Sequence, residues 1–251
     1  MHHLTASTET RQHSPRLVLS VASSEHDVRE VQRLRYKVFI ETLGLSALEN
    51  ADRLDVDEFD DYCDHLIVRE SVTLRVVGTY RVLSPSMARK LGRFYSENEF
   101  DLGRLNHLRG RMVEAGRACI HPEYRGGSVI MLLWSGLADY MRRHRCDYLI
   151  GCASISVADG GYNAIAVYDA LRKLHAAPQE YRVTPHLPFP IRELEGARTP
   201  QVPALIKGYV RSGAWLCGEP AWDPDFESAD LFLMLPLTNL DSRYAKHYGV
   251  E

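Results

Sequence analysis

The chain has 251 residues, of which 45% are hydrophobic and 25% charged, and its formal net charge is −3. That size suffices for a globular protein with a substantial core, and the slightly acidic balance argues against a dedicated nucleic-acid binder, which is typically basic. The five cysteines form no CxxC pair and the eleven histidines are dispersed, so we expect reduced thiols and no metal site. No apolar run approaches the roughly 20 residues of a membrane-spanning helix, so we expect a cytoplasmic protein.

The N-terminal part predicts a leader, a strand and a helix. Residues 1–15, rich in Ser, Thr and His, are expected to be a disordered leader, and residues 16–251 a single domain. A first strand is expected over residues 17–21. Ser24-Glu25-His26-Asp27 resembles a capping box, and the helix it starts should end near Gly44. Hydrophobic residues recur along this helix at helical spacing: Val28, Val31, Leu34 and Val38.

An acidic segment and a pair of strands follow. Carboxylates are dense between Asp52 and Asp64. The apolar runs at 65–68 and 76–83 predict two paired strands joined by a short turn. Residues 85–111 are locally basic and are expected to be rich in loops.

The most informative stretch is a strand, a glycine turn and a helix. Met112–Ile120 predicts a short buried strand, which ends at Pro122 because proline has no N–H for a sheet ladder. Arg125-Gly126-Gly127 then makes a turn, and an apolar run from Val129 opens a helix that closes near Arg145. Free N–H groups at a helix N-terminus favour an anion such as a phosphate. The same pattern also fits an ordinary strand–turn–helix corner.

The C-terminal part alternates strands and helices. We expect a strand over 148–155, a helix over 159–175, an irregular stretch over 185–203, a helix over 204–213, and a hairpin of 215–222 with 229–237. The sequence shows no internal repeat. It therefore predicts an α/β (α+β) fold in a single domain, with a mixed central sheet flanked by helices.

The turn sequence resembles a known signature. His121-Pro122-Glu123-Tyr124-Arg125-Gly126-Gly127 is similar to the acyl-donor motif of the GCN5-related N-acyltransferase (GNAT) superfamily, in which a strand, a phosphate-cradling loop and a helix hold the pantetheine of an acyl thioester. That motif usually continues with small residues, where this chain has Ser128 and Ile130. The resemblance implies the GNAT fold and donor contacts by Cys119, Ile120, Arg125, Gly126, Gly127 and Ser128. Alternatively, Ser128 is only a helix N-cap.

A longer series of motifs narrows the resemblance. Arg35–Phe39, Asp57–Asp60, Gly78–Arg81 and Glu114–Arg117 follow the motif order of the acyl-homoserine lactone synthases. Several segments more closely resemble the ornithine N-acyltransferases of bacterial ornithine-lipid synthesis: 94–102, 116–133, 205–231 and, most specifically, 217–226. This resemblance implies transfer of a 3-hydroxyacyl group from acyl carrier protein to the α-amine of L-ornithine, the first step of ornithine lipid synthesis. It implies no cofactor, since the carrier's phosphopantetheine thioester is a co-substrate.

Other functions fit parts of the pattern. The same fold with a different acceptor would be an N-acyl amino acid synthase or an acyl-homoserine lactone synthase, and a different class would be a non-catalytic, membrane-active protein. The resemblance implies acyl carrier protein and L-ornithine as partners, and peripheral contact with the inner membrane through the amphiphilic product. Arg142, Arg143 and Arg145 either dock the acidic carrier or complement the helix dipole.

Glu114 is our candidate general base. An amine attacks a thioester only when it is neutral, and a model α-amine has a pKa of about 8, so a base beside the donor turn would help. The alternative is a carboxylate that is merely paired with Arg117 or Arg81. Arg117 either orients Glu114, binds a carboxylate or forms a structural ion pair. Tyr168 falls where the superfamily places an acid for the leaving thiolate, or else only packs on its helix.

The acidic segment suits a cationic acceptor. Asp57 and Asp60 are our candidates for the ornithine side-chain ammonium, and Arg35 or Arg81 for its carboxylate. The alternative is that the segment is solvated or braces Arg35. Phe39 is expected either at the acceptor and acyl-chain site or in the core.

Overall fold

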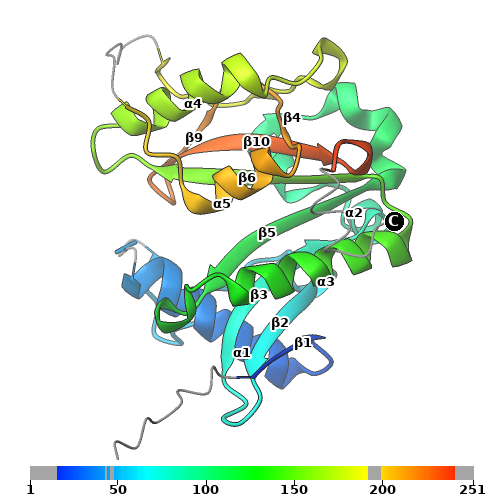
Figure 1. The fold of residues 1–251 in the computed structure, drawn as a ribbon, viewed down its shortest axis with the longest axis vertical. Coiled ribbons are helices and arrows are strands. Elements are labelled where there is room, and N and C mark those ends of the chain that lie inside the picture. Colours follow the sequence, from blue (N-terminus) through cyan, green and yellow to red (C-terminus); the bar gives the residue numbers. More distant parts are fainter. Residues whose placement is uncertain (1–15, 43, 46–47, 192–198, 241–251) are drawn as a thin grey trace, which may run out of the picture.

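The computed structural model describes residues 16–42, 44–45, 48–191 and 199–240 (Figure 1). The predicted leader, residues 1–15, lies outside this part of the chain. One mixed sheet of eight strands runs through the molecule. Its strands are β1 Leu17–Val21, β2 Asp64–Glu70, β3 Val76–Leu83, β5 Met112–Ile120, β6 Tyr148–Ser156, β8 Trp215–Leu216, β9 Ala221–Asp223 and β10 Ser228–Pro236.

The strand order is β1-β2-β3-β5-β6-β10-β8, and β9 also pairs with β10. All of these pairings are antiparallel except that of β5 with β6, which is parallel. A separate pair of short strands joins β4 Phe100–Asp101 to β7 Thr184–Pro185. The predicted mixed central sheet is therefore confirmed.

Helices cover both faces of the sheet (Figure 1). They are α1 Glu25–Tyr36, α2 Pro85–Leu91, α3 Ser128–His144, α4 Tyr162–Leu174 and α5 Ala204–Arg211. Along β2, Leu66 and Val68 are buried with α3, whereas Ile67 is buried with α1, because successive strand residues face opposite sides. The helices α4 and α5 pack with β6 and β10 in a further apolar cluster.

Most of the predicted elements are confirmed, and one expectation is wrong. The first helix begins as predicted, since the Ser24 side chain accepts from the Asp27 N–H. Helical backbone also ends near Gly44 as predicted, although only Glu25–Tyr36 is α-helical and a π-helical turn, Lys37–Thr42, continues it. Residues 85–111, expected to be loops, contain α2 and several 3₁₀ turns. Pro85 at the first turn of α2 is favourable there, as its missing N–H has no helical partner to lose.

The β5–β6 pairing is short, and this creates an opening in the sheet. These strands pair only between Met112–Glu114 and Tyr148–Ile150. Beyond Glu114 the register of β5 on β3 also shifts, so that two residues of β5, Arg117 and Ala118, oppose one residue of β3. Arg117 has φ of 50°, in the left-handed region that non-glycine residues rarely adopt. The strand is therefore bent at the residues that lead toward the donor turn.

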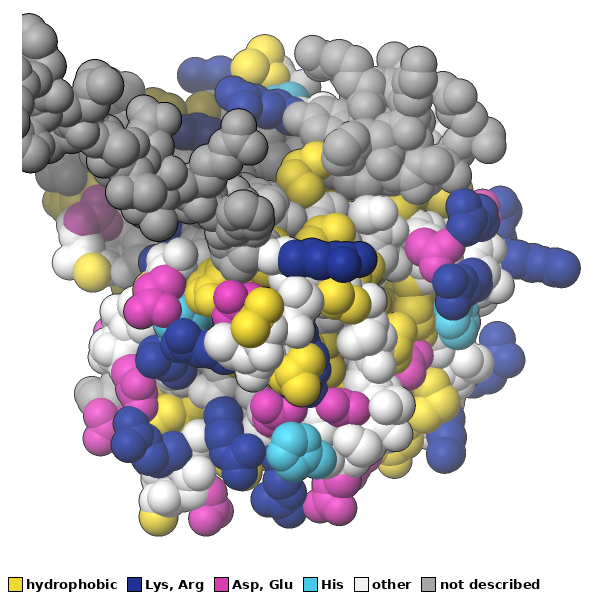
Figure 2. Space-filling model, turned by 60° about the horizontal axis from the view of Figure 1, so that its bottom comes forward, with side chains coloured by type: hydrophobic (Ala, Val, Ile, Leu, Met, Phe, Trp, Pro, Cys, Tyr) yellow, Lys and Arg dark blue, Asp and Glu magenta, His cyan; other side chains and the backbone are white. Residues whose placement is uncertain are grey.

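The surface view shows basic and acidic side chains interspersed around a group of hydrophobic ones, on the face seen when the bottom of Figure 1 is turned forward (Figure 2). Such mixing agrees with the small net charge of −3. Within the described residues, none of the helices combines the length and the apolar character that crossing a membrane requires.

Candidate active site

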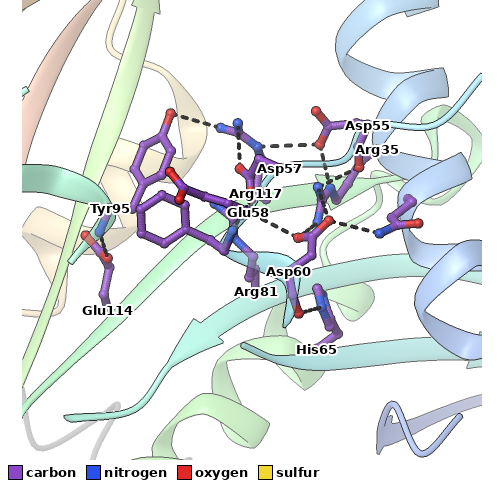
Figure 3. Close-up of polar contacts among 12 residues, drawn as sticks. Arg35, Asp55, Asp57, Glu58, Asp60, His65, Arg81, Tyr95, Glu114 and Arg117 are labelled. Carbon is purple, nitrogen blue, oxygen red and sulfur yellow. Dashed lines mark hydrogen bonds and ion pairs between the residues drawn. The ribbon is translucent and has the colours of Figure 1, made fainter. Parts of the chain in front are cut away.

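A buried network of arginines and carboxylates joins α1, the acidic segment and the sheet (Figure 3). Arg35 of α1 is 0% exposed. Its Nε lies 2.6 Å from Asp55 Oδ2 and its Nη1 lies 2.8 Å from Asp60 Oδ1. A buried guanidinium needs such partners, because an unpaired buried charge is very costly. Two of the acidic segment's carboxylates therefore brace Arg35, as one of the two alternatives predicted.

Two further arginines complete this network. Arg81 of β3 donates from Nη1 to Asp60 Oδ1 at 3.0 Å and also to Asp57. Arg117 donates from Nη2 to Asp57 Oδ2 at 3.3 Å and pairs through Nε with Asp55 at 3.4 Å. Burial acts to raise the pKa of Asp60, but the pairing with Arg35 and Arg81 outweighs it, so that pKa lies well below its usual range. Asp60 is therefore ionised at neutral pH.

Glu114 lies apart from this network and is held by a loop. It is 4% exposed. The Tyr95 N–H donates to its Oε2 at 2.6 Å, the Ser96 N–H donates to its Oε1 at 2.8 Å, and the Ser96 hydroxyl also donates to Oε1. Arg81 and Arg117 pair with aspartates instead. The alternative prediction, that Glu114 is paired with one of these arginines, is therefore wrong. Burial raises the pKa of Glu114, and the Ser96 and Tyr95 hydrogen bonds partly offset that rise.

A cavity of about 240 Å³ lies where β5 and β6 diverge. Glu114, Arg117 and Arg81 reach it together with Phe39, as expected for a shared site. Tyr95 also lines it, and its hydroxyl accepts from Arg117 Nη1 at 3.3 Å. The other lining residues are Phe59, Cys63, Tyr80, Leu83, Ala115, Gly116, Ala118, Cys152, Ser154, Leu205, Tyr209, Asp223, Phe226 and Asp230. This cavity combines the buried carboxylates of Glu114 and Asp230, two arginines and an aromatic wall.

The predicted donor turn follows directly after the cavity's β5 residues. Gly127, with φ of 99°, is the residue that caps α3, and Ser128 is the first helical residue. The alternative of Ser128 as an N-cap is therefore wrong: a left-handed φ at the cap favours glycine. Arg125, Gly126 and Ser128 are exposed, Ile120 is partly buried, and Cys119 is 1% exposed. A long helix with an accessible N-terminus and an adjacent arginine has the features that bind a phosphate.

The structure separates some of the predicted site residues from this cavity. Arg35 is enclosed by Asp55 and Asp60, and each of its three guanidinium nitrogens donates to one of them. Asp60 is 8% exposed and bonded to two arginines. Tyr168, on α4, lines a different groove with Arg104, Arg172, Lys173 and Arg182.

Sequence reasoning missed several residues that complete the site. Tyr95 and Ser96 hold Glu114 mainly through backbone N–H groups, which no side-chain pattern reveals. Asp230 is another, and its signal was visible: it is a lone carboxylate in a strand whose nine residues are all buried. An acidic residue inside such an apolar run seldom occurs without a partner or a function.

Asp230 belongs to a second acidic group beside the same cavity. One ligand atom each from Glu99, Cys152 and Asp230 lies within 4.8 Å of the others, a spacing that could hold a cation. Another group with cation-binding spacing lies on α1 and consists of His26, Asp27 and Glu30. In that group Asp27 and Glu30 already pair with Arg69.

Comparisons with known proteins agree with this geometry. A family model described as an acetyltransferase (GNAT) domain matches residues 34–135. An L-ornithine N(alpha)-acyltransferase of Brucella abortus is 34% identical, over 94% of this chain and 89% of that protein. One of Rhodobacter capsulatus is 33% identical, over 92% of this chain and 93% of that protein.

Solved structures share the fold at low identity. The acyl-homoserine lactone synthase LasI superposes with a TM-score of 0.54 at 14% identity, covering 94% of this chain and 95% of that one. BjaI, a CoA-dependent acyl-homoserine lactone synthase solved with SAM and isopentyl-CoA, gives 0.54 at 15% identity, covering 93% and 90%. The predicted GNAT fold is confirmed.

Proposed function

Because the chain belongs to the family of L-ornithine N(alpha)-acyltransferases, and is therefore an N-acyltransferase, we propose that it transfers a 3-hydroxyacyl group from acyl carrier protein to the α-amine of L-ornithine. The product would be lyso-ornithine lipid, the first intermediate of ornithine lipid synthesis. The observation that carries the proposal is the cavity at the β5–β6 opening, which brings Glu114 and two arginines to one space next to the donor turn.

Glu114 is proposed as the general base. A carboxylate offers about four acceptor positions, and three are used by Tyr95 and Ser96, which leaves one for the acceptor amine or a water. As the amine nitrogen bonds to the thioester carbon, its proton passes to Glu114, and collapse of the intermediate breaks the C–S bond. The pantetheine thiolate leaves and takes a proton from solvent or from the protonated base. The raised pKa of Glu114 makes it a stronger base than a surface glutamate.

Arg81 and Arg117 are proposed to position the acceptor carboxylate. Both line the cavity, and both are held by aspartates. Arg117 also stacks over Phe226, with its guanidinium carbon 4.6 Å from the ring centre. A planar guanidinium fixed in this way is suited to a carboxylate. Phe39, Phe59 and Phe226 offer an apolar wall for the acyl chain.

The donor phosphate is proposed to bind at Arg125, Gly126, Gly127 and the start of α3. We place the enzyme in the cytoplasm, where acyl carrier protein and ornithine meet, with peripheral membrane contact through its product.

The test is a reconstituted reaction with purified chain, a 3-hydroxyacyl carrier protein and L-ornithine. We expect free thiol to appear in step with N-acylornithine, with tandem mass spectrometry placing the acyl group on the α-nitrogen. Omission of ornithine is the control for simple thioester hydrolysis. Thiol release that does not depend on ornithine, or acylation of the δ-nitrogen, would refute the proposal.

A further inference from the structure

The two acidic groups near the cavity differ in how their charge is balanced. Asp55, Asp57 and Asp60 are paired with three arginines. Within the described residues, Glu99, Asp223 and Asp230 form no ion pair with any basic side chain. Asp230 is nevertheless only 3% exposed. A buried carboxylate without a counter-charge is costly, and Asp230 has no basic partner of the kind that the arginines supply to the first group.

The hydrogen bonding of the second group is also incomplete. The Ser228 hydroxyl donates to Asp230 Oδ1 at 2.6 Å, and the Ser154 side chain also hydrogen-bonds Asp230. Glu99 is hydrogen-bonded with Cys152, but its Oε2 is buried without a partner among the described residues. The Glu99 and Asp230 carboxyl groups face each other, so they bond to one another only when one of them carries a proton. A donor with a positive charge would satisfy both groups.

This acidic group opens onto the candidate active site. Asp223 and Asp230 line the same 240 Å³ cavity as Glu114. Tyr80 also lines it, and its hydroxyl is buried without a hydrogen-bond partner in the described part of the chain, although the residue is only 1% exposed. Cys152, next to Asp230, donates from Sγ to Ser96 Oγ at 3.3 Å, and Ser96 in turn donates to Glu114. The acidic group and the proposed base are thus two side chains apart.

We propose that Asp230, supported by Glu99 and Asp223, binds the side-chain ammonium of a diamino acid acceptor. The inference rests on the proposed function, because it takes Glu114 as the place of the reacting α-amine. In ornithine the α-carbon and three methylene groups separate the two amines, and Glu114, Asp223 and Asp230 all line the one cavity that would hold the molecule. The ammonium supplies the missing charge and up to three donors.

The same oxygens could hold a metal ion, and one contact argues against it. A metal would take Cys152 as a thiolate. Here the Cys152 thiol donates its proton to Ser96 Oγ, and burial raises the pKa of that thiol well above its ordinary value. An ammonium requires no such deprotonation.

The test compares two acceptors of equal chain length, L-ornithine and L-norvaline, which lacks the δ-amine. The native enzyme should prefer ornithine. Asp230→Asn should lower kcat/KM for ornithine by about 10- to 100-fold, the size of a lost charge-assisted hydrogen bond, mainly through KM. The value for norvaline should stay within about twofold. Asp57→Asn is the matched control, since Asp57 borders the site but is paired with arginines. The ratio of kcat/KM for ornithine to kcat/KM for norvaline should be the same in this variant as in the native enzyme.

A second variant and a binding measurement guard against misfolding. Glu99→Gln should also lower kcat/KM for ornithine. Calorimetry in two buffers should show proton release when ornithine binds the native protein, and none for norvaline. An unchanged ornithine-to-norvaline ratio in both variants, or loss of ornithine preference on EDTA treatment, would overturn the inference. No turnover with ornithine at all would instead refute the proposed function.

Discussion

At the scale of single residues, the two roles of Glu114 have to be separated. Glu114 holds the loop at Tyr95 and Ser96, and it is also our proposed base. Glu114→Gln should lower kcat by roughly 10²–10⁴, the range of general-base catalysis. The raised pKa of Glu114 should also give kcat/KM an acidic limb, since protonation removes the base. Both are measured by steady-state kinetics across pH.

Ser96→Ala is the matched control for that prediction. It removes the hydroxyl that donates to Glu114 Oε1 but leaves the carboxylate. If Glu114 is the base, this variant loses stability while keeping most of its turnover. Equal losses of kcat in Ser96→Ala and Glu114→Gln would assign Glu114 a structural role.

The raised pKa of Glu99 predicts that the stability of the folded chain depends on pH. Burial, together with the charges of Asp230 and Asp223, raises the pKa of Glu99 from 4.5 to about 9. The folded chain then binds this proton more tightly than the unfolded chain. The free energy of unfolding contributed by Glu99 is therefore fully present below pH 4.5 and is lost as pH rises toward 9.

Urea unfolding of the native chain and of Glu99→Gln at a series of pH values would measure this contribution. The native chain should lose stability relative to the variant across that interval. Parallel pH profiles for the two proteins would contradict it.

At the scale of elements, the arginine network ties α1 and β3 to the acidic segment. Asp60 contacts both Arg35 and Arg81. Asp60→Ala removes a partner from a fully buried guanidinium, so we expect a loss of about 3–5 kcal/mol in the free energy of unfolding. The exposed neighbour Asp61→Ala should change it by less than about 0.5 kcal/mol. Denaturant unfolding of both variants is the measurement, and comparable small losses would show that the network adds little.

The elements themselves were largely predictable, because their signals are local. The N-cap at Ser24 and the glycine turn before α3 each mark a boundary within a few residues. The π-helical turn at Lys37–Thr42 was not, since nothing in its residues distinguishes it from a continued α-helix. The order and register in which the strands pair were also not predictable from local sequence signals.

The residues of the candidate site were more predictable than the partners with which they pair. Glu114, Arg81, Arg117 and Phe39 do line one cavity. Their partners, however, are set by contacts distant in sequence, such as Arg117 with Asp57, 60 residues apart. The sequence therefore indicated which residue types matter, while the fold decided that the aspartates of the acidic segment are neutralised.

At the scale of the whole molecule, we propose that the donor turn and α3 together form the face that meets the acyl donor. Coenzyme A carries a pyrophosphate, whereas a carrier's phosphopantetheine has a single phosphate already esterified to its protein. Arg125, Gly126 and Ser128 are exposed and would form a small anion site, and the partly buried Ile130 stands where the usual signature has a small residue. This geometry favours the carrier as donor. Arg143, 73% exposed, lies at the far end of the same helix, about 24 Å away at 1.5 Å per residue.

We therefore expect acyl carrier protein to exceed the matching acyl-coenzyme A in kcat/KM. That advantage should shrink as salt is raised, because contacts between an acidic partner and exposed basic residues are screened. Arg125→Ala should reduce kcat/KM with either donor, since it removes a contact to the phosphate that both share. Arg143→Ala should affect only the carrier, because coenzyme A is too small to extend from the turn to the far end of the helix. Equal use of both donors over a salt titration, or an equal effect of Arg143→Ala on both, would show that the carrier's protein surface plays no part in recognition.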